Sequence, residues 1–215
     1  MVSKTEKAPR RTKSLPTPEA LRLHAIDMMQ ELGYHAVTLR SLADRIGIKA
    51  ASLYNHIENK EQLLFDLLST IQIELLQEME KRLDGIEGPR NRLRTFVEVH
   101  IEFHTTRRKE VFIGNMERRN LSKSHNQEII RLRTQYQAIL EDILQEGRER
   151  GEFNIIDMRL VTNAIFGALN DIATWYRQNG RLGRADISHT YAQLIFRMLG
   201  ILDETRQEGQ GSKKA

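Results

Sequence analysis

A stretch of the chain around residue 50 gathers side chains that can hydrogen-bond to nucleic acid. Lysine can donate to guanine, asparagine can pair with adenine, and an alanine methyl group can contact thymine. A threonine beside the free amides of a helix N-terminus can bind a phosphate, and an arginine one residue into that helix can reach a phosphate or a base edge. The candidate DNA contacts on these grounds are Thr38, Arg40, Lys49, Ala50, Ala51, Ser52 and Asn55.

Two short helices joined by a tight turn must position these side chains. The apolar spacing predicts one helix over residues 38–46 and a second over residues 49–57. Ala43 is small enough to let the helices cross closely, Gly47 can take the positive φ of the turn, and Leu53 is an apolar plug from the second helix. This pattern is typical of a helix-turn-helix, in which the second helix enters the major groove of DNA.

The region from about residue 17 to residue 68 resembles the tetracycline-repressor (TetR) family of transcription regulators. The matching segments are Gly33-Tyr34, Val37-Thr38-Leu39, Leu42-Ala43, Ile46-Gly47, Ser52-Leu53-Tyr54-Asn55-His56-Ile57 and Asn59-Lys60-Glu61-Gln62-Leu63-Leu64. The resemblance assigns Tyr54, His56 and Lys60 mainly to backbone phosphates, and so adds them to the candidate DNA contacts. The alternatives are packing of Tyr54 on the first helix, a purely structural His56, and a helical hairpin that does not contact DNA.

The same resemblance implies that the rest of the chain forms a helical domain for ligand binding and dimerisation. Its last two long helices would then pair with those of a second subunit in a four-helix bundle. The apolar faces compatible with this bundle are Leu160, Ala164, Ala168, Leu169 and Ile172 on one helix, and Tyr191, Leu194, Ile195, Met198 and Leu202 on the other. Core packing within one subunit would explain part of either face.

A candidate effector pocket draws on aromatic and polar residues of this second domain. Its candidate lining residues are Phe103, His104, Phe112, Met116, Tyr136, Asn163, Phe166, Asn170 and Trp175. Asn163 and Asn170 lie seven residues apart on one face of an otherwise apolar helix, so their amides need partners in the core, across the dimer or in a ligand. Plain core packing is the alternative for each residue of this set, above all for Phe112 and Met116.

Residues 166–182 look like the corresponding segment of TetR-type regulators of fatty-acid, phenylacetate or steroid degradation, which often sense acyl-CoA thioesters. Basic residues that could contact CoA phosphates are Arg107, Arg108, Arg118, Arg119 and Arg177. The alternatives are arginines that are simply solvated, and a regulator of an efflux pump that responds to a drug-like ligand. No cofactor is expected besides the small-molecule effector.

Composition and motifs argue against several other classes of protein. The chain has no cysteine, which excludes disulfides, thiolate nucleophiles and cysteine–zinc sites. No run of 18 apolar residues and no signal-peptide pattern occur, so we expect no membrane partner and a cytoplasmic protein. His100 and His104 could share a helix face as metal ligands do, but no acidic residue stands where the zinc-protease pattern requires it, and we expect no metal.

No phosphate-cradling glycine-rich loop and no Gly-x-Ser-x-Gly elbow occurs, so we expect no enzyme. A helical enzyme or adaptor is the alternative outside regulation. The net charge of +4 lies in residues 1–13, because the remainder holds 28 basic and 28 acidic residues. This basic arm could reach phosphates or a minor groove, or it could be a solvated tail.

We therefore expect an all-α protein of about nine helices. Its expected parts are a disordered basic arm (residues 1–15), a helix-turn-helix domain (16–62), a ligand-binding and dimerisation domain (63–204) and a disordered tail (205–215). Thr17 is expected to cap the first helix and Asn59 the fourth. Further helices are expected over about residues 90–108, 111–118, 124–150, 157–180 and 186–203.

The expected function follows from these parts. We expect a homodimer that binds a two-fold symmetric operator in double-stranded DNA as a ligand-released repressor. The operon that it controls would serve the catabolism of fatty-acid, aromatic or steroid acyl-CoA compounds.

Overall fold

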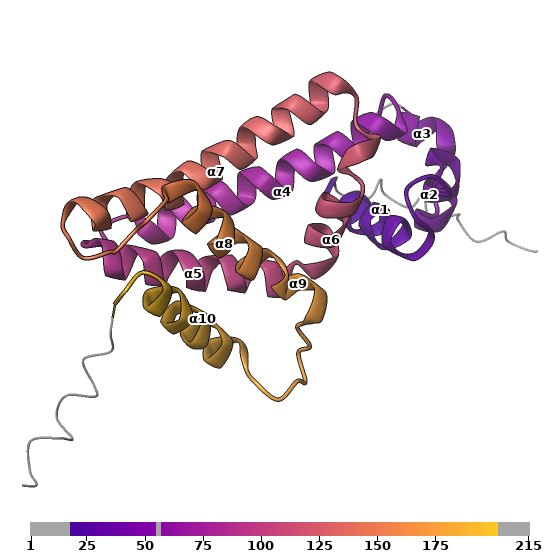
Figure 1. The fold of residues 1–215 in the computed structure, drawn as a ribbon. Coiled ribbons are helices and arrows are strands. Elements are labelled where there is room, and N and C mark those ends of the chain that lie inside the picture. Colours follow the sequence, from indigo (N-terminus) through magenta and orange to yellow (C-terminus); the bar gives the residue numbers. More distant parts are fainter. Residues whose placement is uncertain (1–17, 55–56, 202–215) are drawn as a thin grey trace, which may run out of the picture. The chain divides into compact units, whose positions relative to one another are not determined.

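The computed structural model describes residues 18–54 and 57–201, and these residues contain ten α-helices, one short 3₁₀ helix and no strand (Figure 1). The elements are α1 (Pro18–Leu32), α2 (Leu39–Ile46), α3 (Ala50–Tyr54), α4 (Lys60–Leu83), α5 (Pro89–Thr106), α6 (Arg108–Met116), η1 (Arg118–Asn120), α7 (Lys123–Glu149), α8 (Met158–Asn170), α9 (Ile172–Trp175) and α10 (Arg184–Met198). The all-α class is confirmed. The basic arm, Thr17, Asn55, His56 and the tail after residue 201 lie outside the described residues.

The chain divides after Leu67 into two compact units, and the first contains α1, α2, α3 and the start of α4. Helices α2 and α3 pack against each other, and Ala43 and Leu53 are buried as the helix-turn-helix pattern requires. The backbone of Gly47 has a φ of 73°, which confirms its predicted left-handed conformation. The N–H of Gln62 donates to Asn59 Oδ1 at 2.8 Å, so Asn59 caps α4 as predicted.

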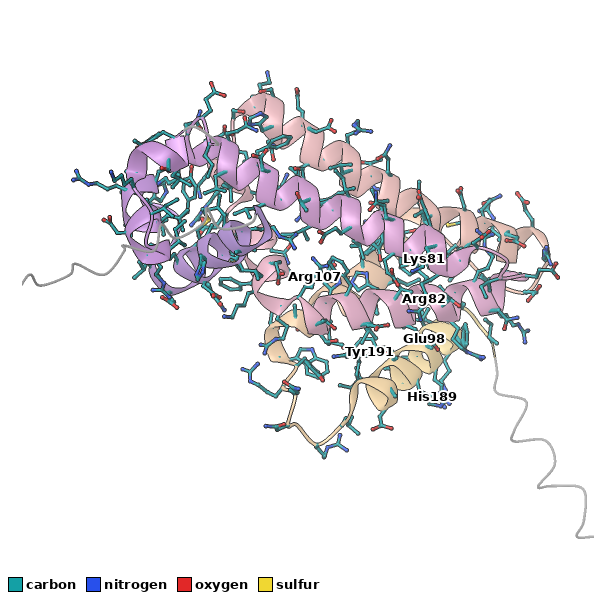
Figure 2. The ribbon with its side chains drawn as sticks, turned by 180° about the vertical axis from the view of Figure 1, so that it is seen from behind. Lys81, Arg82, Glu98, Arg107, His189 and Tyr191 are labelled. Carbon is teal, nitrogen blue, oxygen red and sulfur yellow. The ribbon has the colours of Figure 1, made fainter. Side chains whose placement is uncertain are left out.

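In the second unit α5 is the central helix, with α4 on one side of it and α10 on the other (Figure 1). It also packs against α7, α8 and α9. The α5 side chains Leu93, Phe96, Val97 and Ile101 are fully buried, which explains why this helix holds the unit together. The ring of Tyr191 on α10, which Figure 2 labels, stacks on that of Trp175, the last residue of α9, with centroids 6.5 Å apart.

The structure corrects the helix predicted over residues 157–180, which is divided at Asp171 into α8 and α9. The hydroxyl of Thr174 donates to the Asp171 carbonyl at 2.7 Å and to its carboxylate at 2.9 Å. Such local hydrogen bonds compete with the regular helical ladder. At Tyr176 the ψ of 138° leads the chain out of α9. This break gives one helix more than predicted.

The last helix also ends earlier than predicted, at Met198. Gly200 has a φ of 76°, and the N–H of Ile201 donates to the Phe196 carbonyl at 2.9 Å. A left-handed glycine with this backward hydrogen bond ends a helix.

Candidate functional site

The first unit holds the N-terminus of α2 in a reciprocal cap. The N–H of Ser41 donates to Thr38 Oγ1 at 3.0 Å, and the N–H of Thr38 donates to Ser41 Oγ at the same distance. Because the threonine hydroxyl already serves the cap, the amides of Leu39 and Arg40 are the groups of this helix end that lie outside the internal ladder. An anion at this end would meet those amides first.

The predicted DNA contacts that the structure describes lie at the surface. Exposed positions are Thr38, Arg40, Lys49, Ala51 and Tyr54, and half-buried positions are Ala50, Ser52 and Lys60. Tyr54 is 55% exposed, so part of this residue is accessible to a partner. Asn55 and His56, which follow it, lie outside the described residues.

Lys60 has contacts within the first unit that the sequence did not indicate. Its ammonium donates to the Tyr34 carbonyl at 3.0 Å and to the His35 carbonyl at 3.4 Å, and it lies 4.3 Å from the centroid of the Tyr34 ring. These contacts tie the start of α4 to the turn after α1. A lysine ammonium has three donors, so one of them remains for a phosphate.

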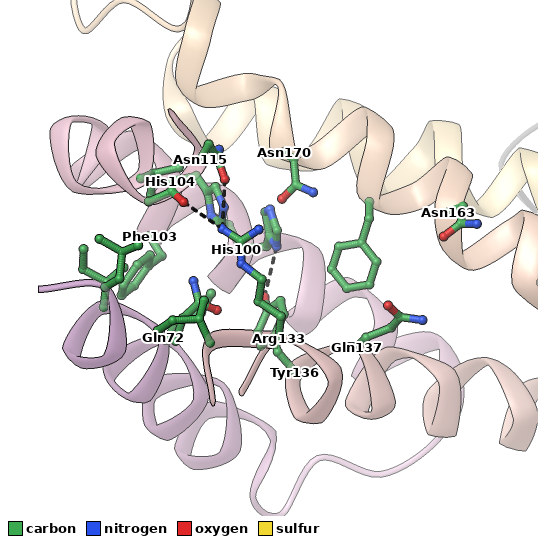
Figure 3. A pocket seen from close by; sticks show the side chains of 17 residues that line it. Gln72, His100, Phe103, His104, Asn115, Arg133, Tyr136, Gln137, Asn163 and Asn170 are labelled. Carbon is green, nitrogen blue, oxygen red and sulfur yellow. Dashed lines mark hydrogen bonds between the residues drawn. The ribbon is translucent and has the colours of Figure 1, made fainter. Parts of the chain in front are cut away.

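The second unit contains a cavity of about 210 Å³ between α4, α5, α6, α7 and α8 (Figure 3). Six of the predicted pocket residues line it: Phe103, His104, Tyr136, Asn163, Phe166 and Asn170. The lining is completed by Leu68, Ile71, Gln72, Leu75, His100, Val111, Gly114, Asn115, Ile129, Arg133 and Gln137. Aliphatic and aromatic side chains therefore surround a small set of amides, two imidazoles, one phenol and one guanidinium.

Three predicted pocket residues do not line the cavity. Phe112 is 41% exposed, because α6 turns Val111 and Gly114 inward instead. Met116, one turn further, is 50% exposed and lines a separate hollow. Trp175 is 43% exposed.

One end of the cavity holds two stacked histidines. The rings of His100 and His104 are 3.8 Å apart and nearly parallel. The Nδ1 of His104 lies 2.9 Å from the His100 carbonyl, and since a carbonyl only accepts, this nitrogen carries the proton. Burial lowers the pKa of His104 to about 4, and burial together with His104 lowers the pKa of His100 well below its usual value. Both rings are therefore neutral near pH 7.

The phenol of Tyr136 contacts the same pair. Its oxygen lies 3.0 Å from His100 Nδ1, and burial raises its pKa well above the usual value. The phenol is therefore protonated at neutral pH. The centroid of its ring lies 5.3 Å from that of the Phe96 ring and 5.9 Å from that of the Phe166 ring. This aromatic packing fixes the hydroxyl at this end of the cavity.

Arg133 is the single charged residue of the cavity lining. Its guanidinium donates to the Gly114 carbonyl at 3.1 Å and to Asn115 Oδ1 at 3.2 Å (Figure 3). Both acceptors are neutral, and no aspartate or glutamate belongs to the lining. Burial, and after it the nearby Arg118, lowers the pKa of Arg133. The cavity thus carries one positive charge that no lining carboxylate balances.

Sequence reasoning did not place His100 or Arg133 in the pocket. His100 was considered only as half of a metal pair, although its spacing of four from His104 puts both rings on the face of α5 that also carries Phe103. Arg133 lies one turn before Tyr136 and Gln137, which would have indicated that it shares their face of α7. The polar residues on these two helix faces could have indicated that His100 and Arg133 line the pocket.

A second, cationic hollow of about 670 Å³ adjoins the cavity through a shared residue, Asn115. We call it the basic hollow, and its lining is Asn115, Met116, Arg118, Arg119, Leu121, Lys123 and Asn126. Arg118 donates to Asn126 Oδ1 at 2.9 Å, and no carboxylate belongs to the lining. Three cations therefore surround a solvent-facing recess.

The other arginines considered for phosphate binding have partners elsewhere. Arg107, which Figure 2 labels, pairs with Glu74. Arg108 donates to the Ala173 carbonyl, and Arg177 donates to the carbonyls of Thr174 and Tyr176. Of the five candidates, only Arg118 and Arg119 belong to the lining of the basic hollow.

Each of the two helices predicted to form the dimer interface has an exposed side with apolar or small residues. On α8, Leu160 is 68% exposed, and Ala164 and Ala168 are exposed as well. On α10, Leu194 is 54% exposed and Met198 is 43% exposed. Of the other residues of these faces, Leu169, Ile172 and Ile195 are buried in the subunit and Tyr191 is half-buried. Leu202 lies outside the described residues.

The described residues contain no cluster of three or more metal-ligating side chains and no helix long and apolar enough to cross a membrane. His100 and His104 thus stand without a third ligand in the described part of the chain. Both histidines line the cavity.

Comparison with known proteins gives matches over both units. The family model of bacterial regulatory proteins of the tetR family matches residues 23–67. The model of the tetracyclin repressor-like C-terminal domain matches residues 87–199.

Individual relatives match most of the chain. The HTH-type transcriptional repressor KstR2 of Mycolicibacterium smegmatis is 29% identical over 82% of this chain and 87% of its own length. The fatty acid metabolism regulator protein of Bacillus subtilis is 23% identical over 80% of this chain and 89% of its own. Among solved structures, AibR in complex with isovaleryl coenzyme A and operator DNA superposes with a TM-score of 0.76, at 25% identity over 83% of this chain and 97% of that chain.

Proposed function

Since the chain belongs to the TetR family of bacterial regulatory proteins, we propose that it represses a catabolic operon and leaves its operator when an acyl-CoA thioester binds. The family assignment makes the protein a DNA-binding transcription regulator, and we propose no catalytic role for it. Its operator lies on bacterial DNA, so we place its action in the cytoplasm. The repressor sign and the effector class are supported by KstR2, by the fatty acid metabolism regulator and by AibR bound to isovaleryl coenzyme A.

The observation that carries the effector class is the basic hollow beside the cavity. A cavity of about 210 Å³ is too small for a whole acyl-CoA, since pockets for drug-sized ligands begin near 300 Å³. It suits an acyl group, because an engineered apolar cavity of about 150 Å³ binds benzene. The three cations of the basic hollow suit the phosphates, and the two sites share Asn115.

A cationic drug fits this site poorly. The lining of the cavity includes Arg133 and no carboxylate that would compensate a positive ligand. The geometry therefore favours an anionic or oxygen-bearing effector over a cationic substrate of an efflux pump.

We propose that DNA is contacted by the exposed side of α2 and α3. Thr38, Arg40, Tyr54 and Lys60 would hold phosphates, and Lys49 with Ala50, Ala51 and Ser52 would lie nearest the base edges. A second copy would pair through the exposed sides of α8 and α10, which gives two recognition helices and a two-fold symmetric operator. Helix α4 carries Lys60 at its first residue and cavity residues such as Gln72 further along, so a ligand-induced shift of this helix would affect both functions.

The test measures displacement of fluorescent operator DNA, selected first from random sequences, by octanoyl-CoA, octanoate and CoA. Octanoyl-CoA should displace the DNA. The double variant R118M/R119M should need about 10-fold more, because charge pairs with two arginines at exposed and half-buried positions contribute about 1–2 kcal/mol together. Its response to octanoate should change less, because octanoate carries no phosphate. The matched control is R131M, which removes an exposed arginine of α7.

Two results would contradict the effector assignment. One is operator DNA that no acyl-CoA of 4 to 16 carbons releases. The other is release by tetraphenylphosphonium, a lipophilic cation, in preference to the thioesters.

A further inference from the structure

One polar atom of the cavity is left without a partner. His100 is 1% exposed, and its Nε2 is buried and accepts or donates no hydrogen bond among the described residues. Buried polar atoms in native proteins are paired in nearly all cases, and unpaired ones need an explanation. Since His100 lines the cavity, a ligand is the partner that would satisfy this nitrogen.

The neighbouring hydrogen bond decides whether this nitrogen donates or accepts. Tyr136 Oη and His100 Nδ1 are 3.0 Å apart, and one of them carries the proton between them. If the phenol donates, only the Nε2–H remains unpaired. If the imidazole donates, both the phenolic hydrogen and the Nε2 lone pair lose partners. The first arrangement leaves fewer buried groups unsatisfied, so His100 presents an N–H donor to the cavity.

The second donor at this end is Arg133. It lies close enough to the stacked histidines to lower the pKa of His104, and Figure 3 shows its guanidinium beside the two rings. Its hydrogen-bond partners are neutral, as described above, so its charge is available to an anion or to a strongly polarised oxygen. Elsewhere the lining combines apolar side chains such as Leu68, Ile71 and Phe166 with uncharged amides, and it contains no further charged group.

We propose that His100 Nε2–H and the Arg133 guanidinium together bind the acyl oxygen of the effector, either the carbonyl of a thioester or the carboxylate of the free acid. The choice of an acyl ligand rests on the proposed function. The two residues would then determine specificity, because they distinguish an oxygen-bearing acyl chain from an alkyl chain of equal length.

Two CoA ligands that differ only in the acyl oxygen measure the contribution of this oxygen to binding. Octanoyl-CoA and S-octyl-CoA, a thioether, share the CoA moiety and the chain length, and only the first carries a carbonyl. Calorimetry on the full-length protein should give about 10- to 100-fold tighter binding of octanoyl-CoA, since each of the two net hydrogen bonds contributes up to about 10-fold. In H100F, which keeps a flat aromatic ring against Phe96 and His104, this preference should fall by about 10-fold, because only the Arg133 donor remains, while S-octyl-CoA binds as before.

Binding of octanoate tests the role of the positive charge of Arg133. R133M should weaken octanoate binding by about 10- to 100-fold, as expected for a charge-assisted hydrogen bond, and R133K should recover part of it. The controls are H189F on α10 and R131M on α7, both at exposed positions outside the cavity.

An infrared measurement on the unmodified protein does not depend on the folding of any variant. The carbonyl band of octanoyl-CoA labelled with ¹³C at C1 should move to lower frequency on binding, because two donors polarise the bond.

The outcomes separate this inference from the proposed function. Binding of octanoyl-CoA with an unshifted band, or with equal preference over S-octyl-CoA in wild type and H100F, overturns the inference and leaves the proposed effector intact. Binding of octanoate alone, lost in R133M, supports the inference and overturns the CoA assignment. Binding of none of the three ligands overturns both.

Discussion

Acidification from pH 7 to pH 5 should destabilise the second unit through its stacked histidines. Burial lowers the pKa of His104 to about 4, whereas the unfolded chain takes up this proton near pH 6.5. Between these two values the unfolded state binds more protons, so stability falls as the pH falls and reaches its lower limit below about pH 4. At pH 5 this linkage costs about 2 kcal/mol for His104 relative to pH 7.

His100 contributes in the same direction. Its pKa is also lowered by burial and by His104, so it increases the loss over the same interval. The loss from His104 alone, about 2 kcal/mol, is already a large fraction of the roughly 5–15 kcal/mol that stabilises a typical domain.

Urea unfolding at pH 5, 6 and 7, at a fixed protein concentration, measures this loss. Trp175 is the single tryptophan of the chain and lies in the second unit, so its fluorescence reports on the relevant part. H104Q should reduce the pH dependence, because it removes one of the two shifted groups and one cause of the shift of the other. The control H189Q replaces an exposed histidine of α10 (Figure 2) and should leave the dependence unchanged. Equal losses in wild type and H104Q would refute the reasoning.

Two further substitutions probe the packing of the second unit. G147A should lower the free energy of unfolding by about 1–3 kcal/mol in the same urea assay, because a Cβ at this position would lie 2.0 Å from the buried Phe153 ring. A stability equal to wild type would show that the ring moves aside without cost. L194E should convert a dimer to a monomer in sedimentation velocity, while I130E, at an exposed site on α7, should not. A dimer that persists in L194E would place the interface elsewhere.

Local patterns allowed the helices of the first unit to be predicted in detail. The prediction required a positive φ at Gly47 and burial of Ala43 and Leu53. The structure shows both. The Asn59 cap was equally local, since its partner Gln62 is three residues away. Contacts of Lys60 with the carbonyls after α1 were not predictable, because they join residues 26 and 25 positions apart in sequence.

The cavity was harder to predict because five helices enclose it. For each helix, the residues that face the cavity must be distinguished from their neighbours in sequence. On α6 the predicted lining residue was Phe112, whereas its neighbour Val111 is the buried one. The prediction favoured the larger, aromatic side chain. Which residue faces the cavity depends instead on its position around the helix axis. Arg133 was missed for the opposite reason, because a charged residue on a long helix is usually solvated.

The polar end of the cavity is best understood as a feature that the free protein does not need for folding. An unpaired buried donor on His100 costs about 1–3 kcal/mol, and two desolvated imidazoles make the unit sensitive to acid. An apolar side chain of similar size would avoid both penalties. A ligand oxygen would remove the first penalty and would stabilise the folded state by mass action. The features that lower the stability of the second unit are thus those that would make an acyl ligand fit its cavity.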